Sequence, residues 1–172
     1  YLLDQPAQAF TFANSVYTDP GTPESIKRTA SLWLGRIHYD SNELDQALGF
    51  FESTVKFGGN VGAESQFMIS RILFDKAEYE KSEQNIFTLV SDYSSYDEWK
   101  FKGFLLLVRT YIGLDDLFQA RATAESILEN VNEEWVQNAC TDLMLEIETL
   151  EKGEPNGTDL IETGTLIDND EK

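Results

Sequence analysis

Three arginine side chains recur at matching places along the chain and are the residues best suited to bind a charged ligand. Arg36, Arg71 and Arg109 are separated by 35 and 38 residues, and each follows a similar apolar segment. The planar guanidinium group binds a carboxylate through two parallel hydrogen bonds. Only 13 of the 172 residues are Lys or Arg, so three of them at equivalent positions predict a site for an acidic partner.

No set of side chains with the spacing of a catalytic centre accompanies these arginines. His38 is the only histidine and Cys140 the only cysteine in the sequence, and we expect both to be buried packing residues. The glycine-rich stretch 58–62 lacks the Lys-Ser/Thr ending of a phosphate-binding loop, which favours a linker. The sequence therefore predicts a protein that is not an enzyme and needs no metal or cofactor.

Composition and charge narrow the class of partner. With 31 Asp and Glu residues against 13 Lys and Arg, the formal net charge of −18 repels phosphate backbones and argues against nucleic-acid binding. The longest apolar run, residues 104–108, is far shorter than the roughly 20 residues of a membrane-spanning helix, so we expect no membrane insertion. A hydrophobic fraction of 41% indicates a folded chain. Because the sequence starts at Tyr1 without Met or a signal peptide, we expect it to be part of a longer protein.

The arginines belong to a repeating unit. Segments that begin at Leu34, Ile69 and Leu107 align with one another in their order of apolar, small and aromatic residues. Apolar residues recur three and four positions apart and no segment alternates with a period of two, which predicts helices and no strands. Short polar turns divide each copy into an antiparallel helix pair, and they lie at 41–42, 76–78 and 113–116. The repeats span about 28–61, 62–96 and 97–131.

The segments on either side of the three repeats differ from them. Residues 5–17 resemble the second helix of a further copy and form a half repeat. Residues 133–151 predict an amphipathic capping helix that covers the apolar end of the last repeat. Residues 153–172 are rich in Gly, Thr, Asn and acids, which indicates an acidic tail, either flexible or folded back. We therefore expect a solenoid over residues 1–152, followed by this tail.

The repeat resembles the tetratricopeptide repeat (TPR), a helix–turn–helix unit of about 34 residues. The resemblance rests on the Leu34-Gly35 pair, the aromatic turn at His38-Tyr39, and Ala47 followed four residues later by Phe51. It covers roughly residues 28–130. The Trp that the family carries three residues before the Leu-Gly pair is replaced in all three copies, which makes the array a divergent one.

The resemblance implies an all-α, right-handed TPR superhelix of antiparallel helix pairs, whose first helices line a concave face that holds extended peptides. On that face the three arginines would be flanked by apolar residues. These are Leu32, Phe67 and Leu105, one turn before the arginines, and Tyr39, Phe74 and Ile112 after them. The array is also similar to the C-terminal part of large bacterial cell-envelope proteins of this family. That similarity implies a periplasmic or cell-envelope location, with the cytoplasm as the alternative.

Two functions follow from these patterns. The first is a protein–protein interaction module or scaffold that binds an extended, acidic and hydrophobic peptide segment in the concave groove. Residues 159–168 of the tail combine acidic and apolar side chains and are one candidate for that ligand. The alternative is a purely structural segment of a longer solenoid, with no ligand of its own. Its arginines would then form ion pairs, for which Arg36 and Arg71 have an Asp four residues later, whereas Arg109 has a Gly.

Overall fold

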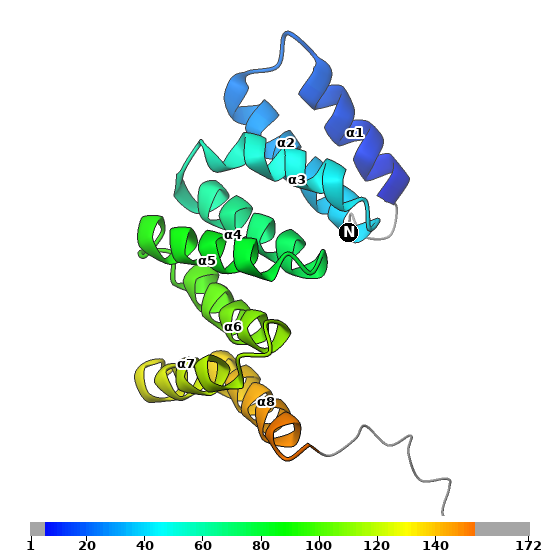
Figure 1. Ribbon diagram of the computed structural model, residues 1–172. Coiled ribbons are helices and arrows are strands. Elements are labelled where there is room, and N and C mark those ends of the chain that lie inside the picture. The colour runs from blue at the N-terminus through cyan, green and yellow to red at the C-terminus, as the bar shows by residue number, and fades with distance from the viewer. Residues whose placement is uncertain (1–5, 154–172) are drawn as a thin grey trace, which may run out of the picture.

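The computed structural model describes residues 6–153, and in this part the chain is all α-helical. Eight helices follow one another, with no strand among the described residues (Figure 1). They are α1 (Pro6–Thr18), α2 (Glu24–Asp40), α3 (Leu44–Val55), α4 (Gly59–Asp75), α5 (Tyr79–Asp92), α6 (Asp97–Gly113), α7 (Leu117–Asn130) and α8 (Glu134–Glu151). The predicted all-α fold is confirmed, with α1 and α8 at the places expected for the half repeat and the capping helix. The candidate ligand segment 159–168 lies outside the described residues.

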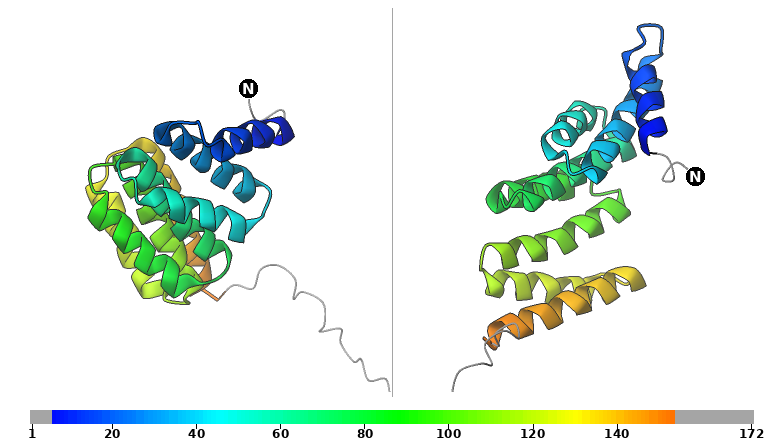
Figure 2. Two further views of the ribbon diagram at one scale, coloured as in Figure 1. Left: turned by 90° about the horizontal axis from the view of Figure 1, so that it is seen from above. Right: turned by 90° about the vertical axis from the view of Figure 1, so that its right-hand side faces the viewer.

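The helices pack in series, each against the next one in the chain, and form a curved array (Figures 1 and 2). The even-numbered helices also contact one another, α2 with α4, α4 with α6 and α6 with α8. Within residues 6–153 the odd-numbered helices contact only their neighbours in the chain. The even-numbered helices thus form one layer, in which successive helices lie closer together than the odd-numbered helices do in the other layer. We call it the inner layer, because the array curves toward it.

Burial of apolar side chains between successive helices holds the array together. One buried cluster joins α2, α3 and α4 around Phe51 and Ile72, and another joins α6, α7 and α8 around Val108. A smaller cluster around Ile86 joins α5 to α6. Full burial of one large apolar side chain stabilises a fold by roughly 1.5–3 kcal/mol. Since each helix pair shares its apolar residues with its neighbours, no pair buries them alone.

Small residues set how closely the helices approach. A Cβ atom on Gly35 of α2 would lie 2.9 Å from the ring of Phe51, which is fully buried in α3. A Cβ atom on Gly103 of α6 would lie 2.8 Å from Leu89 of α5. Each glycine therefore makes room for a large side chain on the adjacent helix, and this complementarity gives the close packing of protein interiors.

The turns inside the three helix pairs share one backbone conformation. Asn42, Ala77 and Asp115 occupy equivalent positions and have positive φ angles of 60°, 57° and 58°. In the second turn, the N–H groups of Ala77 and of the next residue donate to carbonyls in the last turn of α4. This is the Schellman arrangement, in which glycine usually occupies the left-handed position.

The prediction that residues 58–62 form a linker is wrong. α4 begins at Gly59, so most of this stretch is the first turn of a helix. A Cβ atom on Gly62 would lie 2.7 Å from the hydroxyl oxygen of Tyr93 and 3.0 Å from the carbonyl oxygen of Val55. The glycine thus allows α4 to pack closely at this point. This packing outweighs the low helix propensity of glycine, which is about 1 kcal/mol less favourable than that of alanine.

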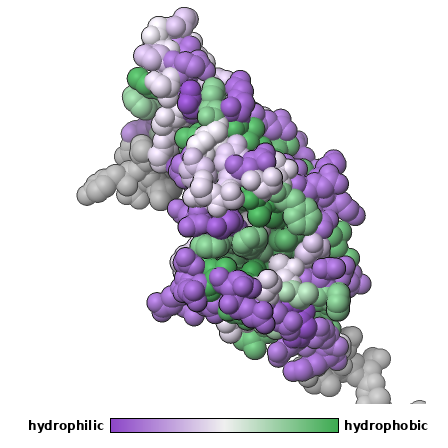
Figure 3. Space-filling view, turned by 90° about the vertical axis from the view of Figure 1, so that its left-hand side faces the viewer, coloured by the Kyte–Doolittle hydropathy of each residue, from purple (hydrophilic) through white to green (hydrophobic). Residues whose placement is uncertain are grey.

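The surface of the array is not uniformly polar. On the face shown in Figure 3, hydrophobic side chains are exposed in the middle of the array between hydrophilic borders. A connected apolar area on a protein surface is a common mark of an interaction site. Every helix within residues 6–153 is too short or too polar to span a membrane.

We expect Ala77→Gly to stabilise the protein by about 1 kcal/mol, because it relieves a left-handed conformation that costs an L-residue with a Cβ atom roughly 1–2 kcal/mol. Asn42→Gly is the matched control, since asparagine tolerates the same conformation and the change should be nearly neutral. Urea unfolding followed by circular dichroism measures both. A loss of stability in Ala77→Gly would contradict the prediction.

Candidate functional site

The three arginines of the predicted site lie on successive helices of the inner layer, Arg36 on α2, Arg71 on α4 and Arg109 on α6. Arg36 contacts Glu64 of the following inner-layer helix, whereas Arg71 and Arg109 share the lining of one hollow with Lys102 of α6 and Ala139 of α8. By their spacing along the chain, Glu64, Lys102 and Ala139 occupy corresponding positions on α4, α6 and α8. One is an anion, one a cation and one neutral, so the three guanidinium groups have three different electrostatic environments.

Arg36 is held in an ion pair inside the array. Its guanidinium group donates to the carboxylate of Glu64, whose side chain is only 5% exposed. The Trp33 ring lies 4.8 Å from the centre of the same guanidinium group. Asp40, the acid four residues later, is not its partner, because the buried carboxylate of Glu64 requires a counter-charge and Asp40 is exposed at the end of α2. Arg36 thus joins α2 to α4, while its own side chain is 36% exposed.

Arg71 forms the ion pair with Asp75 that the sequence predicts, with 3.0 Å between Nε and Oδ1. The hydroxyl group of Tyr39, on α2, donates to the same carboxylate at 2.7 Å. Burial, together with this hydrogen bond, raises the pKa of Tyr39 to about 12. The Arg71 side chain remains 36% exposed, so its guanidinium group reaches the surface with part of its charge neutralised.

Arg109 is exposed and forms no ion pair within residues 6–153. Gly113 lies four residues after Arg109, at the position where Arg71 has its partner Asp75. Ala139 of α8 occupies the position that corresponds to Glu64 of α4. Of the three inner-layer arginines, Arg109 is therefore the one whose hydrogen-bond donors have no ionic partner in the described part of the chain.

Arg109 lies between two neighbouring hollows of the inner layer, which together we call the cationic groove. The first has a volume of about 170 Å³ and combines basic side chains with apolar ones. Its lining residues are Phe67, Arg71, Lys102, Leu105, Leu106, Arg109, Ala139 and Leu143. The second hollow is lined by Arg109 together with Phe74, Tyr79, Ile112, Gly113 and Glu146. The cationic groove thus spans α4, α6 and α8, with one residue from α5.

Four of the six predicted flanking residues line the cationic groove, namely Phe67, Leu105, Phe74 and Ile112. Leu32 does not, because it is 6% exposed and packs in the core between α2, α3 and α4. Tyr39 does not either, since its hydroxyl group is bound to Asp75. Leu32, Arg36 and Tyr39 therefore lie outside the cationic groove, and Arg36 pairs with Glu64 of α4.

Lys102 and the residues from α8 were missed by sequence reasoning. Lys102 precedes Leu105 by three residues and Arg109 by seven, so helical spacing could have placed it on the same stripe of α6. Its ammonium group pairs with Glu98 at 2.7 Å. No repeat pattern could have indicated Ala139, because α8 lies outside the three aligned copies.

His38 and Cys140 are packing residues, as the sequence predicts. The His38 ring stacks on Phe50 with 5.3 Å between ring centres, and its Nδ1 atom lies 2.5 Å from the carboxylate of Glu43. Cys140 is fully buried, and burial raises the pKa of its thiol, which disfavours the reactive thiolate. In residues 6–153 no group of three or more His, Cys, Asp or Glu side chains is placed to hold a metal ion.

Comparisons with known proteins assign no family to this geometry. The chain matches no family model, no curated protein and no solved structure. The fold and the site define a helical repeat array with a cationic groove on its inner layer. Its membership of the tetratricopeptide family stays a prediction from the sequence.

Removal of the ion pair whose acid is buried, Arg36–Glu64, should have a larger effect than removal of the Arg71–Asp75 pair. Arg36→Met is expected to destabilise the protein by about 2–3 kcal/mol, because it leaves the Glu64 carboxylate buried without a partner. Arg71→Met removes an exposed pair and should cost no more than about 0.5 kcal/mol. Urea unfolding measures both, and Arg36→Met combined with Glu64→Met should recover most of the loss. Equal, small effects for the two single variants would show that Arg36 does not stabilise the array.

The raised pKa of Tyr39 predicts that the folded protein loses stability at alkaline pH. Its folded-state pKa of about 12 lies above the ordinary value of 10.0, so its contribution to stability is complete below pH 10.0 and is lost as the pH rises through about 12. The free energy of unfolding of the wild type should fall more steeply across this window than that of Tyr39→Phe. Urea unfolding at a series of pH values tests this, and parallel curves would contradict it. Tyr111, whose pKa burial also raises to about 12, should leave some dependence on pH in the variant.

Proposed function

We propose that this chain is a protein-interaction module of the tetratricopeptide type, whose cationic groove binds an extended peptide segment with both acidic and apolar side chains. The observation that carries the proposal is Arg109, an exposed guanidinium group without an ionic partner among residues 6–153, beside a hollow that apolar and basic side chains line. Three consecutive pairs of antiparallel helices, spaced like tetratricopeptide units, support the assignment to this class.

An acidic side chain of the peptide would bind at Arg109. A carboxylate can accept two parallel hydrogen bonds from a guanidinium group, which makes such pairs both strong and directional. Arg71 and Lys102 line the same hollow, but Asp75 and Glu98 already partly neutralise their charges. Arg109 is therefore the point of the cationic groove at which a carboxylate gains the most electrostatic free energy.

An apolar side chain of the peptide would enter the first hollow. Its volume of about 170 Å³ is close to the roughly 150 Å³ of a protein cavity that holds one benzene molecule. One leucine or phenylalanine side chain would fill it and contact Phe67, Leu105 and Leu143. Glu146 places a negative charge in the second hollow, which directs the carboxylate of the peptide toward the first. The expected ligand thus carries an acid close to one large apolar residue.

The alternative is a purely structural role for the arginines, and Arg36 and Arg71 favour it. Arg36 is paired with the buried Glu64, and Arg71 with Asp75. In that case the arginines would only hold the inner-layer helices in place, and Arg109 would be a solvated side chain of the acidic surface. The two functions differ in one measurable property, which is whether the cationic groove binds a ligand.

Selection from a library of short random peptides, displayed on phage and panned against the full chain, tests the proposal. We expect the enriched peptides to carry Asp or Glu close to a large apolar residue. The affinity of an enriched synthetic peptide, measured by fluorescence anisotropy, should fall at least tenfold in Arg109→Gln, because a charge-assisted hydrogen-bonded pair is lost. A synthetic peptide of residues 159–168 in the same assay tests whether the tail is a ligand.

Lys152→Gln is the matched control for loss of one positive charge. Lys152 is exposed at the C-terminal end of α8, outside the cationic groove, and has no ion pair within residues 6–153. An affinity that falls in Arg109→Gln and is unchanged in Lys152→Gln would support binding in the groove. Enrichment of peptides without acids, or equal affinity in the wild type and both variants, would contradict binding of a carboxylate at Arg109, and no enrichment at all would favour the structural alternative.

A further inference from the structure

A hollow lined by basic side chains lies among the first three helices of the array, and we call it the basic hollow. It has a volume of about 310 Å³ and is formed by the end of α1, the first half of α2 and the end of α3. Its lining residues are Tyr17, Glu24, Lys27, Arg28, Ser31, Ser53, Lys56 and Phe57. Three bases against one acid give this lining a net positive charge, in a chain whose net charge is −18.

The bases of the basic hollow lack the acidic partners that most bases of the array have. Residues 6–153 contain 12 Lys and Arg side chains, and seven of them form ion pairs with Asp or Glu. Lys27, Arg28 and Lys56 form no ion pair within that range. The sequence has 31 acids for 13 bases, so bases that pair with none of the described acids are unusual here. Three of them around one hollow indicate a site for an anion that is not part of the described chain.

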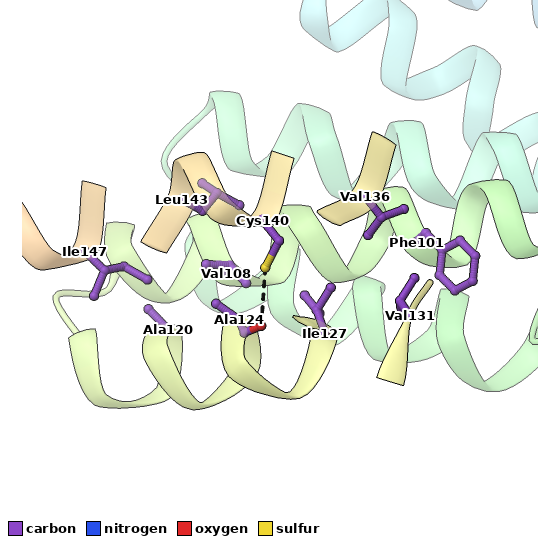
Figure 4. Close-up of a cluster of buried hydrophobic side chains, with 10 residues drawn as sticks. All are labelled: Phe101, Val108, Ala120, Ala124, Ile127, Val131, Val136, Cys140, Leu143 and Ile147. Atoms are coloured by element: carbon purple, nitrogen blue, oxygen red, sulfur yellow. Dashed lines mark hydrogen bonds between the residues drawn. The ribbon is translucent and has the colours of Figure 1, made fainter. Parts of the chain in front are cut away.

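Arg28 occupies a position at which the other two repeats bury an apolar side chain. Eight residues before the equivalent arginines of α2, α4 and α6, the chain has Arg28, Ala63 and Phe101. Ala63 is fully buried, and Phe101 is 9% exposed in the cluster of α6, α7 and α8 that Figure 4 shows. Packing alone would favour an apolar residue at this position in α2 as well. The guanidinium group of Arg28 therefore needs another explanation than the packing of the array.

The charges of Arg28 and Lys56 both lie near the ring of Phe57. The guanidinium carbon of Arg28 is 4.1 Å from the centre of this ring, and the ammonium nitrogen of Lys56 is 5.3 Å from it. The Nε atom of Arg28 is also buried, with no hydrogen-bond partner among the described residues. Two like charges near one ring and a buried donor without an acceptor both cost free energy. An anion bound to the two cations would offset the repulsion between them.

The chemistry of the lining favours a phosphate group over a carboxylate. A guanidinium group has five N–H donors and each ammonium group has three, so the three bases can serve many acceptors. A phosphate monoester has three strong acceptor oxygens and a charge of about −1.5 to −2 at neutral pH. A carboxylate has two oxygens and a single charge, which would leave part of the positive charge of the lining unbalanced. A long polyanion is disfavoured, because the chain as a whole is acidic and would repel it beyond the hollow.

We propose that the basic hollow binds a phosphate monoester group, whose oxygens accept hydrogen bonds from Lys27, Arg28 and Lys56. Arg28 suits such a ligand, because a guanidinium group can bind two phosphate oxygens at once. Glu24 repels the ligand and limits its affinity. All residues that line the hollow lie between Tyr17 and Phe57, whereas the cationic groove is formed by later helices. The proposal therefore does not rest on the proposed function.

The Nε–Hε resonances of arginine side chains, observed by nuclear magnetic resonance on the full chain, test the proposal. The sequence has five arginines, so each resonance can be assigned from single variants. Inorganic phosphate and N-acetyl-phosphoserine amide are titrated separately at about pH 7.5, where both are mostly dianions. The resonance of Arg28 should shift and saturate, whereas that of Arg121, which pairs with Glu151, should not move. Binding of either compound supports the proposal, and the tighter one identifies the source of the phosphate group.

Three variants test the role of the charges in the hollow. Lys56→Gln removes an exposed charge and should weaken binding by about fivefold or more, as should Arg28→Gln. Glu24→Gln removes the one acid of the lining and should strengthen binding. Thermal unfolding checks that each variant remains folded, and Lys56→Gln decides the test if Arg28→Gln does not.

Lys152→Gln and Arg109→Gln are the matched controls, since each removes one exposed positive charge outside the basic hollow. The affinity for phosphate should be unchanged in both. No saturable shift in the wild type, an equal shift with acetate at the same ionic strength, or equal affinity in Lys56→Gln and Lys152→Gln would overturn the proposal. Loss of binding in Arg109→Gln alone would overturn it too, because the phosphate would then bind in the cationic groove.

Discussion

Burial of the apolar side of each helix pair by an inner-layer helix is the interaction on which the array depends. A pair such as α7 and α8 leaves a surface of alanines and branched side chains, and α6 removes that surface from water. Small residues such as Gly35 and Gly103 let the helices come close enough for this burial. The turns serve the same packing. Each of the three turns within a helix pair has one left-handed residue and reverses the chain, so that the second helix lies antiparallel to the first.

The arginine row shows how the same residue acquires different roles in a repeat array. Arg36, Arg71 and Arg109 occupy the same place in three helices, yet the corresponding position on the next inner-layer helix holds an acid, a base or an alanine. The acid, Glu64, forms an ion pair with Arg36, whereas the alanine, Ala139, offers Arg109 no charge, and Arg109 has no ionic partner in the described part of the chain. Divergence at the corresponding position therefore gives equivalent arginines different ionic partners.

Much of the fold could be predicted from the sequence, because helical periodicity, turns and repeat spacing are local properties. The helix pairs, the half repeat at α1, the capping helix α8 and the Arg71–Asp75 pair all depend on spacing within a segment. The first turn of α4 could not be predicted in this way. Its glycines favour a linker when judged alone, and only close packing of Gly62 against Val55 and Tyr93 makes a helix there favourable.

Patterns within the sequence predict an all-α array of helix pairs and the alignment of three arginines on equivalent helices. Which of the arginines form ion pairs between helices follows from packing, because the partner of Arg36 is 28 residues away on the next inner-layer helix. Packing also decides that Leu32 is buried while Phe67 and Leu105 line a groove, and that α8 contributes Ala139 and Leu143 to it. Spacing along a helix specifies which side a residue lies on, but burial and charge pairing depend on what the neighbouring helix brings to that side.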